Sequence, residues 1–208
     1  MAGWVILGGG GHARVVLQLA REAGHGVIGY TAPAAGPGGW SIPWIGTDHD
    51  LLNRADASGL TALLGVGKMD AGDGRLRLQT RLEAAGIRFP AAGSRSAVLH
   101  DDVIIGAGTL VLSGAVVVTG TRLGRACIVN TNASVDHDCV LEDDVHVAPG
   151  VTLCGGVRVG AHTMTGAAAT VLPGVSICAR SVIGARSTVT RAIAEPGVYV
   201  GTPAQRIR

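Results

Sequence analysis

Aliphatic side chains recur at every sixth position through the second half of the chain. Stepping by six from Leu99 to Val189, fifteen of the sixteen positions are Leu, Ile or Val, and the exception is Thr165. The register holds without an insertion over the whole stretch. The position four residues after each aliphatic one is mostly small or β-branched, and glycine often follows the aliphatic residue directly, as at Gly106, Gly124, Gly160, Gly166 and Gly184. A fixed period of this kind indicates a repeat architecture.

The hexads predict a left-handed parallel β-helix whose interior is filled by one aliphatic side chain from each short strand. Three hexads form one triangular coil, so the fifteen hexads predict five coils, stacked at roughly the 4.8 Å spacing of neighbouring strands. The small residue fits near each corner, and glycine permits backbone conformations that other residues resist. The alternative is an antiparallel sandwich with accidental periodicity, which sixteen consecutive positions in register disfavour.

The first half of the chain alternates apolar strands with helices, which argues for a small parallel α/β domain. The expected strands lie at residues 3–8, 27–30, 42–46, 60–64 and 87–89. The expected helices lie at residues 12–23, 48–55 and 73–85, and Thr47 with Asp48 forms the N-cap of the second one. We therefore expect a Rossmann-like α/β domain over residues 1–92, followed by the β-helix domain with a C-terminal tail over residues 93–208.

Composition and charge narrow the class of protein. The net charge is +2 and there is no Lys/Arg-rich run, so nothing indicates a nucleic-acid partner. The first residues lack the basic and apolar regions of a signal peptide, and no apolar stretch approaches the ~18 residues of a membrane span. The four cysteines contain no CxxC pair, which favours reduced thiols in a cytoplasmic protein over a disulfide framework.

A glycine-rich turn joins the first expected strand to the first expected helix. Gly8, Gly10 and Ala13 fit the pattern G-x-G-x-x-A, in which glycines let the backbone approach a phosphate at a helix N-terminus. The alternative is a tight turn without a ligand. A dinucleotide oxidoreductase would need an acid after the second strand to hold a ribose, but residues 30–33 read Tyr-Thr-Ala-Pro. The domain is also short for a full dinucleotide-binding sheet, so a dehydrogenase is disfavoured.

The sharpest polar feature of the hexad array is the sequence VDHD at residues 135–138. The imidazole of His137 titrates near neutral pH and is the usual general base, and a neighbouring carboxylate can orient one of its ring nitrogens. His137 lies away from the inward aliphatic position, so its side chain can face outward. The alternative is a surface histidine between two solvated acids.

Two further histidines raise the alternative of a metal site. His146 lies nine residues after His137, and His162 lies sixteen residues after His146. Trimeric β-helix hydratases of the γ-class carbonic anhydrase type bind zinc with three histidines, two of which are typically five residues apart. No such pair occurs here. Zinc also needs three or four ligands that converge on one point, so a metal site is disfavoured.

Several of these features coincide in one known family. The glycine turn, the hexads, the sequence VNT at residues 129–131, the VDHD sequence and the ending VGTPA at residues 200–204 together resemble the bacterial sugar acyltransferases of the NeuD/PglD type. The resemblance covers essentially the whole chain. It implies an N-terminal domain that binds a nucleotide-linked amino sugar. It also implies a homotrimer in which the co-substrate acetyl-CoA lies between adjacent β-helices, with active sites at the subunit interfaces.

The resemblance implies roles for individual residues. His137 matches the catalytic base and Asp138 the acid that tunes it. The residues matched to acetyl-CoA contacts are His146, near the thioester, and Ala167 and Ala185, along the CoA arm. The residues matched to substrate contacts are Gly8, Gly10, Gly11, His12, Gly65 and Asn130. The chain departs from the family at Ala32 and Pro33, where family members often carry two acids.

We therefore predict an acetyl-CoA-dependent N-acetyltransferase that acts on a nucleotide-linked sugar of the UDP-4-amino-sugar type. His137 would act as the general base, no metal would be required, and His146 or a backbone N–H would stabilise the oxyanion. Three alternatives remain at this point: a sialic acid-type O-acetyltransferase, a γ-carbonic-anhydrase-like hydratase, and a non-catalytic protein that binds a sugar nucleotide.

Overall fold

The structure is a computed structural model that describes residues 3–36, 38–54 and 56–208. The chain divides into two compact units. The first unit contains the residues up to Gly67 together with Gly74–Ala92. The second unit contains Gly93–Arg208 together with the short segment Lys68–Asp73. This segment joins two elements of the first unit in sequence, yet it packs with the second.

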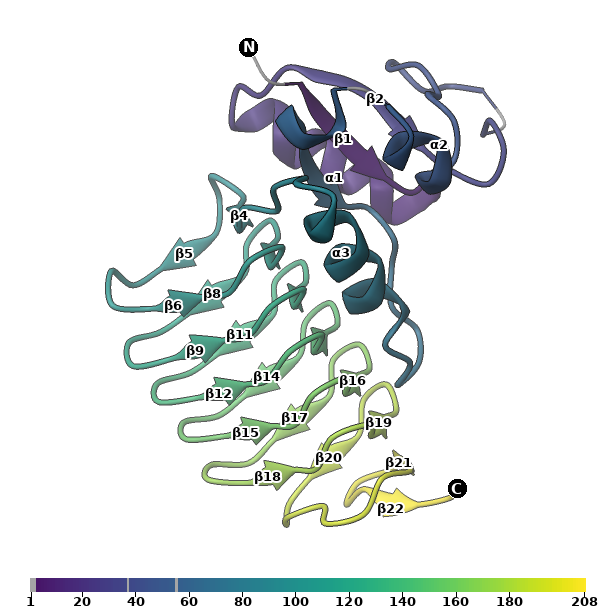
Figure 1. The fold of residues 1–208 in the computed structure, drawn as a ribbon. Coiled ribbons are helices and arrows are strands. Elements are labelled where there is room, and N and C mark those ends of the chain that lie inside the picture. Colours follow the sequence, from purple (N-terminus) through teal and green to yellow (C-terminus); the bar gives the residue numbers. More distant parts are fainter. Residues whose placement is uncertain (1–2, 37, 55) are drawn as a thin grey trace. The chain divides into compact units, whose positions relative to one another are not determined.

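The first unit is built on a parallel sheet of three strands in the order β2-β1-β3 (Figure 1). The strands are β1 (Trp4–Leu7), β2 (Val27–Thr31) and β3 (Thr61–Leu64). The helices are α1 (Gly11–Glu22), α2 (Asp48–Leu52), a 3-10 turn (Ala57–Gly59) and α3 (Gly74–Ala84). Strands and helices alternate along the chain as the sequence predicts, and the three strands form the buried centre of this unit.

Two of the strands expected in the first unit are wrong. Residues 42–46 and 87–89 each contribute a single isolated bridge to a neighbouring strand instead of a ladder. Proline has no backbone N–H to donate to a ladder. Pro43 interrupts the first of these segments, and Pro90 follows the second directly.

The second unit is a parallel β-solenoid whose chain passes through three sheets in turn (Figure 1). Sheet 1 contains β4 (Ala92–Gly93), β7 (Leu110–Val111), β10 (Ile128–Val129), β13 (His146–Val147), β16 (Met164–Thr165), β19 (Val182–Ile183), β21 (Val198–Val200) and β22 (Gln205–Arg206). Sheet 2 contains β5 (Val98–Leu99), β8 (Val116–Val117), β11 (Ser134–Val135), β14 (Thr152–Leu153), β17 (Thr170–Val171) and β20 (Thr188–Val189). Sheet 3 contains β6 (Ile104–Ile105), β9 (Arg122–Leu123), β12 (Val140–Leu141), β15 (Arg158–Val159) and β18 (Ser176–Ile177). The five predicted coils are the intervals between the six stacked strands of sheet 2, and β4 and β21 extend the solenoid at its two ends.

The predicted inward positions form the core of this unit. The aliphatic residue of each hexad is the second residue of its strand, and every one from Val111 to Val189 is buried. The small position four residues later is buried at every coil from Thr109 to Ser187. Thr165, the exception among the aliphatic positions, is buried as well. Its hydroxyl donates a hydrogen bond to the backbone carbonyl of His146 at 3.1 Å, which compensates for the loss of contact with water. The parallel coils and the buried positions that the hexads predict are therefore confirmed.

The left-handed backbone conformation occurs at the corners, three residues after the aliphatic position. Glycine adopts it at several corners, such as Gly120, as its freedom at positive φ allows. Other corners place a non-glycine residue there, including Asp138, Asp144 and His162. Aspartate and histidine are among the residue types that tolerate this region best. These three corners supply the polar clusters of the candidate active site.

The glycines directly after the aliphatic positions serve close packing, so the expectation that they supply unusual backbone conformations is wrong. Their φ angles are not positive. A Cβ on Gly160 would lie 2.3 Å from the backbone nitrogen of Ala179, and a Cβ on Gly106 would lie 2.5 Å from the backbone carbonyl of Gly124. These glycines let one coil pass close to the backbone of the next.

We expect Gly160→Ala to lower the free energy of unfolding by about 1–3 kcal/mol, because the added Cβ must push the next coil away. Denaturant unfolding followed by circular dichroism measures this loss. Gly93→Ala is the matched control, since its Cβ would meet only the Leu99 Cδ1 at 3.4 Å. Equal losses in the two variants would contradict the explanation.

Candidate active site

His137 and Asp138 form a hydrogen-bonded pair at the corner that follows β11, between sheets 2 and 3. The Nδ1 atom of His137 lies 2.8 Å from Oδ2 of Asp138, and the carboxylate of Asp136 accepts the backbone N–H of His137 at 2.7 Å. Asp138 therefore orients the ring, while Asp136 holds the main chain. The hydrogen bond to Asp138 raises the pKa of His137 above its usual value, and the charge of Asp136 adds to the rise. Both side chains of the pair are more than half exposed.

Glycines on the two neighbouring coils make room for this pair. A Cβ on Gly155 would lie 2.4 Å from Nε2 of His137, and a Cβ on Gly120 would lie 2.4 Å from Oδ1 of Asp138. Each glycine is eighteen residues, or one coil, from the side chain that it accommodates. The sequence analysis missed both positions, although the eighteen-residue spacing would have pointed to them.

His146 is the first residue of β13, and both of its ring nitrogens have partners. Nδ1 lies 2.8 Å from the backbone carbonyl of Lys68, and Nε2 lies 3.1 Å from Nδ2 of Asn130. A carbonyl oxygen only accepts, so Nδ1 carries the proton and Nε2 accepts from the amide. The Oδ1 atom of Asn130 accepts the backbone N–H of Thr131 at 2.8 Å, which agrees with this amide orientation. The expected role of His146 as an oxyanion donor does not fit this arrangement, because neither nitrogen has an uncommitted proton.

A buried ion pair fixes the segment Lys68–Asp73 to the solenoid. The Nζ atom of Lys68 lies 2.9 Å from Oδ2 of Asp144, and the two side chains are 3% and 0% exposed. The Nδ1 atom of His162 lies 3.2 Å from the same Oδ2 atom of Asp144. Lys68 also donates a hydrogen bond to the backbone carbonyl of Gly72. The sequence analysis missed Lys68 and Asp144. The available signal was composition, since Lys68 is the only lysine of the chain.

The predicted site residues of the second unit fall on two different edges of the solenoid. His137 and Asp138 lie between sheets 2 and 3. Asn130 follows β10 at the edge between sheets 1 and 2, and Ala167 and Ala185 are exposed at the same edge on later coils. His146 lies in sheet 1 beside that edge, on the side chain of Asn130. Within one chain, the six strands of sheet 2 separate the two groups.

The predicted phosphate-binding turn lies between β1 and α1 in the first unit. Gly8 has a φ of +117°, and a Cβ there would lie 2.9 Å from the backbone carbonyl carbon of Gly65, so the structure brings these two predicted residues together. Gly10 is the N-cap of α1, and neither a side-chain cap nor an acidic residue occupies the first turn of that helix. Among the described residues, no atom lies within 4 Å of the place that a Cβ on Gly10 or Gly11 would take, and His12 continues the same turn.

The cysteines are poorly suited to carry an acyl group. Cys127 and Cys139 fill the small positions of their hexads and are fully buried, and the four cysteines are free thiols. Burial raises the pKa of Cys127 to about 12 and that of Cys139 to about 11. The nucleophilic form of a cysteine is the thiolate, and at neutral pH these two stay protonated.

The three histidines considered as zinc ligands do not converge within one chain. His137 lies between sheets 2 and 3, His146 in sheet 1, and His162 between sheets 3 and 1. Over residues 3–36, 38–54 and 56–208, no three side chains of His, Cys, Asp or Glu form a group able to hold a metal ion. In the same residues, no helix has the length and apolar character to cross a bilayer.

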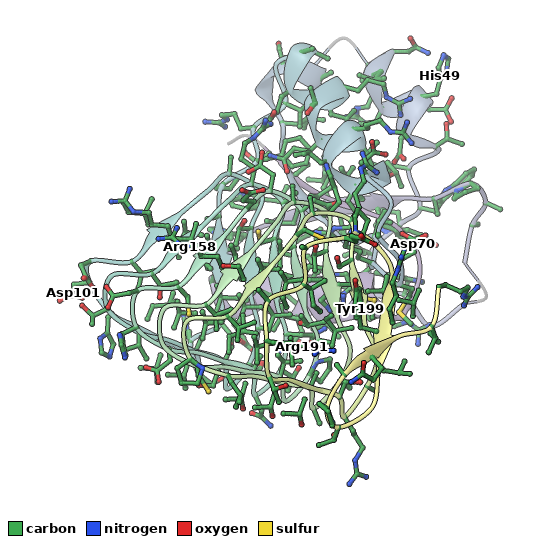
Figure 2. The ribbon with its side chains drawn as sticks, turned by 90° about the horizontal axis from the view of Figure 1, so that it is seen from below. His49, Asp70, Asp101, Arg158, Arg191 and Tyr199 are labelled. Carbon is green, nitrogen blue, oxygen red and sulfur yellow. The ribbon has the colours of Figure 1, made fainter. Side chains whose placement is uncertain are left out.

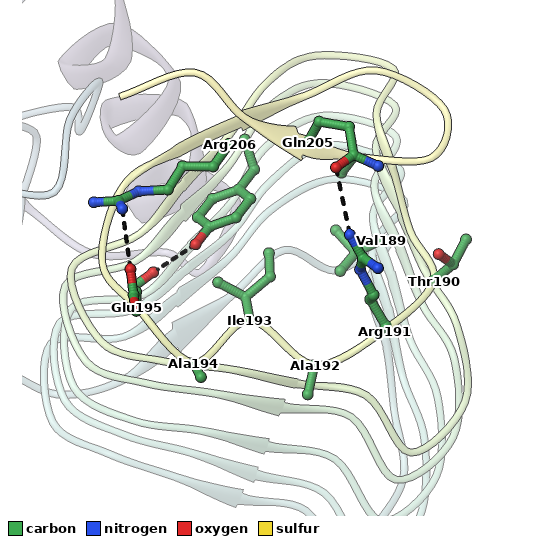
Figure 3. Close-up of a pocket in the computed structure, with 11 residues that line it drawn as sticks. Val189, Thr190, Arg191, Ala192, Ile193, Ala194, Glu195, Gln205 and Arg206 are labelled. Carbon is green, nitrogen blue, oxygen red and sulfur yellow. Dashed lines mark hydrogen bonds and ion pairs between the residues drawn. The ribbon is translucent and has the colours of Figure 1, made fainter.

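A cavity of about 290 Å³ lies at the C-terminal end of the solenoid (Figure 3). Figure 2 looks onto this end, where Arg191 and Tyr199 lie. Its walls are tied by an ion pair between Arg206 and Glu195 at 3.0 Å and by a hydrogen bond from Tyr199 to the Glu195 carbonyl at 2.8 Å. None of the predicted site residues lines this cavity, and its polar groups bind one another.

Comparisons with solved structures agree with a hexapeptide-repeat acyltransferase. No family model matches the chain. The PerB protein of Caulobacter crescentus, solved with CoA and GDP-perosamine, is 33% identical, and the alignment covers 100% of this chain and 98% of that one with a TM-score of 0.92. The acetyltransferase domain of PglB from Neisseria gonorrhoeae is 28% identical and is covered over 100% of both chains, with a TM-score of 0.93.

Curated sequences match over shorter stretches. A UDP-3-O-acylglucosamine N-acyltransferase of Herminiimonas arsenicoxydans is 33% identical over 117 residues, which are 56% of this chain and 32% of that protein. A GDP-perosamine N-acetyltransferase of Escherichia coli O157:H7 is 31% identical over 80 residues, which are 38% of this chain and 36% of that protein. The chain spans about a third of the length of the curated relatives it matches. With the full-length structural matches, the chain belongs to the hexapeptide-repeat sugar acetyltransferases of the NeuD/PglD type.

Replacing Asp138 by Asn should lower the pKa of His137, because the neutral amide no longer stabilises the imidazolium. An NMR titration of the His137 ring measures this pKa directly. Asp101→Asn removes an exposed acid from the same edge of the solenoid and serves as the control. If the His137 pKa were the same in wild type and Asp138→Asn, the assigned pair would be wrong.

Replacing Lys68 by Met should lower the free energy of unfolding by about 3–5 kcal/mol, because the buried Asp144 carboxylate loses its ammonium partner. Arg180→Met is a matched control, since Arg180 lies on the solenoid and pairs with Asp73 of the same segment at 3.5 Å, in a more exposed position. That pair should contribute about 1 kcal/mol or less. Chemical denaturation compares the two variants, and similar losses would show that the Lys68 pair is no more stabilising than a surface pair.

Proposed function

We propose that the protein is an acetyl-CoA-dependent N-acetyltransferase that acts on the amino group of a nucleotide-linked amino sugar. The observation that carries this proposal is the His137–Asp138 pair, whose hydrogen bond is made at Nδ1 and whose Nε2 remains available as a proton acceptor. The full-length similarity to PerB, which is described with CoA and GDP-perosamine bound, supports both substrates. Acetyl-CoA is the co-substrate in this proposal, and no step requires a metal.

The chemistry follows from the free nitrogen of His137. The sugar amine attacks the thioester carbonyl carbon, and Nε2 of His137 accepts a proton from the amine as the new C–N bond forms. The tetrahedral intermediate then expels CoA, and the proton passes from His137 to the leaving thiolate. General-base assistance of this kind contributes roughly 10²–10⁴-fold, and positioning of both substrates contributes a further large part. With both nitrogens of His146 engaged, a backbone N–H is the proposed donor to the oxyanion.

The two units take different parts in this proposal. Residues 1–92 would form a Rossmann-like domain that binds the sugar nucleotide through Gly8, Gly10, Gly11, His12 and Gly65. Residues 93–208 would form the left-handed β-helix that binds acetyl-CoA, with contacts at His146, Ala167 and Ala185. The UDP-linked substrate expected from the sequence stays a prediction, and GDP-perosamine in the PerB complex makes a GDP-linked sugar the second substrate to test.

We propose that the active site is completed in a homotrimer. The outward residues of sheet 2 carry no charge: Val98, Val116, Ser134, Thr152, Thr170 and Thr188. If the three copies of this sheet face a threefold axis, the edge with His137 in one copy meets the edge with Asn130 in the next. A neighbouring copy would thus join the two groups of predicted residues that one chain keeps apart. A fully active monomer in sedimentation experiments would contradict this arrangement.

Sugar O-acetylation is the second candidate function, because the same pair could deprotonate a hydroxyl. It would need a stronger base, since a neutral amine is already nucleophilic and a hydroxyl is not. The hydratase alternative receives no support from the positions of the three histidines within one chain. A protein that only binds a sugar nucleotide would release no CoA.

A thiol-release assay with acetyl-CoA and a panel of UDP-, GDP- and dTDP-linked amino sugars tests the proposed function. His137→Ala should reduce kcat at least about a hundredfold, because the general base is lost, while the Kd for acetyl-CoA changes little. His100→Ala, which removes another exposed histidine of the solenoid, should retain wild-type activity. Undiminished acetyl transfer by His137→Ala would remove His137 from the mechanism, and turnover with hydroxyl sugars alone would favour O-acetylation.

A further inference from the structure

The first unit has no acid directly after β2, yet a carboxylate reaches that point from elsewhere in the chain. Thr31 is the last residue of β2 and is fully buried. Its hydroxyl donates a hydrogen bond to Oδ1 of Asp48 at 2.5 Å. Asp48 is the first residue of α2, seventeen residues further along the chain. The carboxylate is therefore held at the carboxyl end of β2, where Ala32 and Pro33 offer none.

Thr31 also contacts the glycine turn. Its backbone carbonyl accepts the N–H of Gly8 at 2.8 Å, in continuation of the parallel pairing between Leu7 and Thr31. The strand order β2-β1-β3 places β2 on one side of β1 and β3 on the other, so the chain first moves outward from β1 to β2 and then back past β1 to β3. Open parallel sheets bind ligands at the carboxyl ends of their strands where this crossover direction changes. The glycine turn and the Asp48 carboxylate both lie at the carboxyl ends of the strands. Thr31 links them, because it is hydrogen-bonded to Gly8 through its backbone and to Asp48 through its side chain.

The start of α2 does not require the Asp48 side chain. Thr47 caps the helix as the sequence predicts, and the reciprocal bond comes from Asp50, whose Oδ2 accepts the Thr47 N–H at 2.8 Å. The segment before the helix is fixed to the end of β2 by a hydrogen bond from Ala32 N–H to the Gly46 carbonyl at 3.1 Å. Within the described chain, the only hydrogen bond of the Asp48 side chain is the one to Thr31, so Oδ2 remains an open acceptor.

The other half of the same edge presents donors. The first turn of α1 has no side-chain cap and no acidic residue, and its N-cap Gly10 faces open space. Free N–H groups at a helix N-terminus favour a phosphate. The edge therefore pairs a phosphate-binding turn with a carboxylate acceptor.

We propose that Asp48, held in place by Thr31, accepts hydrogen bonds from the ribose hydroxyls of the sugar nucleotide whose diphosphate lies on the glycine turn. This inference rests on the proposed function and extends it to the class of nucleotide. Oδ1 is committed to Thr31, and Oδ2 receives the 2′ and 3′ hydroxyls. A 2′-deoxyribose offers one donor fewer. The site therefore selects a ribonucleoside diphosphate such as UDP or GDP over its deoxy counterpart.

The test is calorimetric titration of the full chain with UDP, GDP, 2′-deoxy-UDP and 2′-deoxy-GDP. In the wild type, the preferred ribonucleotide should bind roughly tenfold tighter than its deoxy form, as expected for a hydrogen bond to a charged acceptor. Asp48→Asn should bring the two affinities close together, because the amide is a weaker acceptor. Asp56→Asn removes an exposed carboxylate of the same unit that pairs with Arg54, and it should keep the full preference.

A second variant guards against misfolding of the first. Thr31→Val keeps the shape of the buried side chain and leaves the Asp48 carboxylate in the chain, but it removes the hydrogen bond that positions this carboxylate. This variant should therefore also bind ribo- and deoxynucleotides with more similar affinities. Equal affinity of the wild type for ribo- and deoxynucleotides would overturn the inference alone, as would an unchanged preference in a folded Asp48→Asn variant. If no nucleotide of the panel binds the wild type, the inference and the sugar-nucleotide part of the proposed function both fail.

Discussion

The second unit depends on one constraint, which is that each coil must lie within hydrogen-bonding distance of the next over the whole solenoid. That spacing puts residues eighteen apart in direct contact. The residue type at each position must therefore fit the residues at the same place one coil before and one coil after it. At Gly160 the constraint is a backbone approach that leaves no space for a Cβ. At Gly155 the same absence of a Cβ leaves space for the His137 ring. A single geometric rule thus sets both the stacking of the coils and the place of the candidate base.

The two ion pairs of the candidate site differ in burial. The exposed pair is suited to moving a proton, and the buried pair is suited to holding a segment in place. The His137–Asp138 pair is exposed, and exposed pairs contribute little to stability. Its proton can move without disturbing the fold. The Lys68–Asp144 pair is buried, and a buried charge that loses its partner is strongly destabilising. That pair fixes the segment whose backbone carbonyl holds His146, so a stable interaction sets the orientation of a ring that contacts Asn130.

The sequence predicts the features that recur and misses those that depend on contacts between distant residues. The hexads can be recognised because fifteen consecutive repeats keep one period, and His137 can be recognised because it stands among polar residues between two aliphatic positions of that period. Lys68 and Asp144 are 76 residues apart, so no local pattern connects them. Asp48 reaches the end of β2 through a loop, and a search for an acid next to Thr31 in sequence could not find it. Apolar character alone predicts strands at 42–46 and 87–89, but Pro43 within the first segment and Pro90 directly after the second limit each to a single bridge.

A triangular solenoid also limits what one chain can do by itself. Side chains at the same edge meet from coil to coil, but side chains at different edges are separated by a complete sheet. The candidate base lies at one edge of sheet 2, and Asn130 lies at the other. No change in rotamer can move a side chain across a sheet whose strands are stacked through the core. In the proposed homotrimer, a second copy of the chain would bring the two groups together. The outward face of sheet 2 adjoins both edges and carries no charge, so the proposed contact would bury no unpaired charge there.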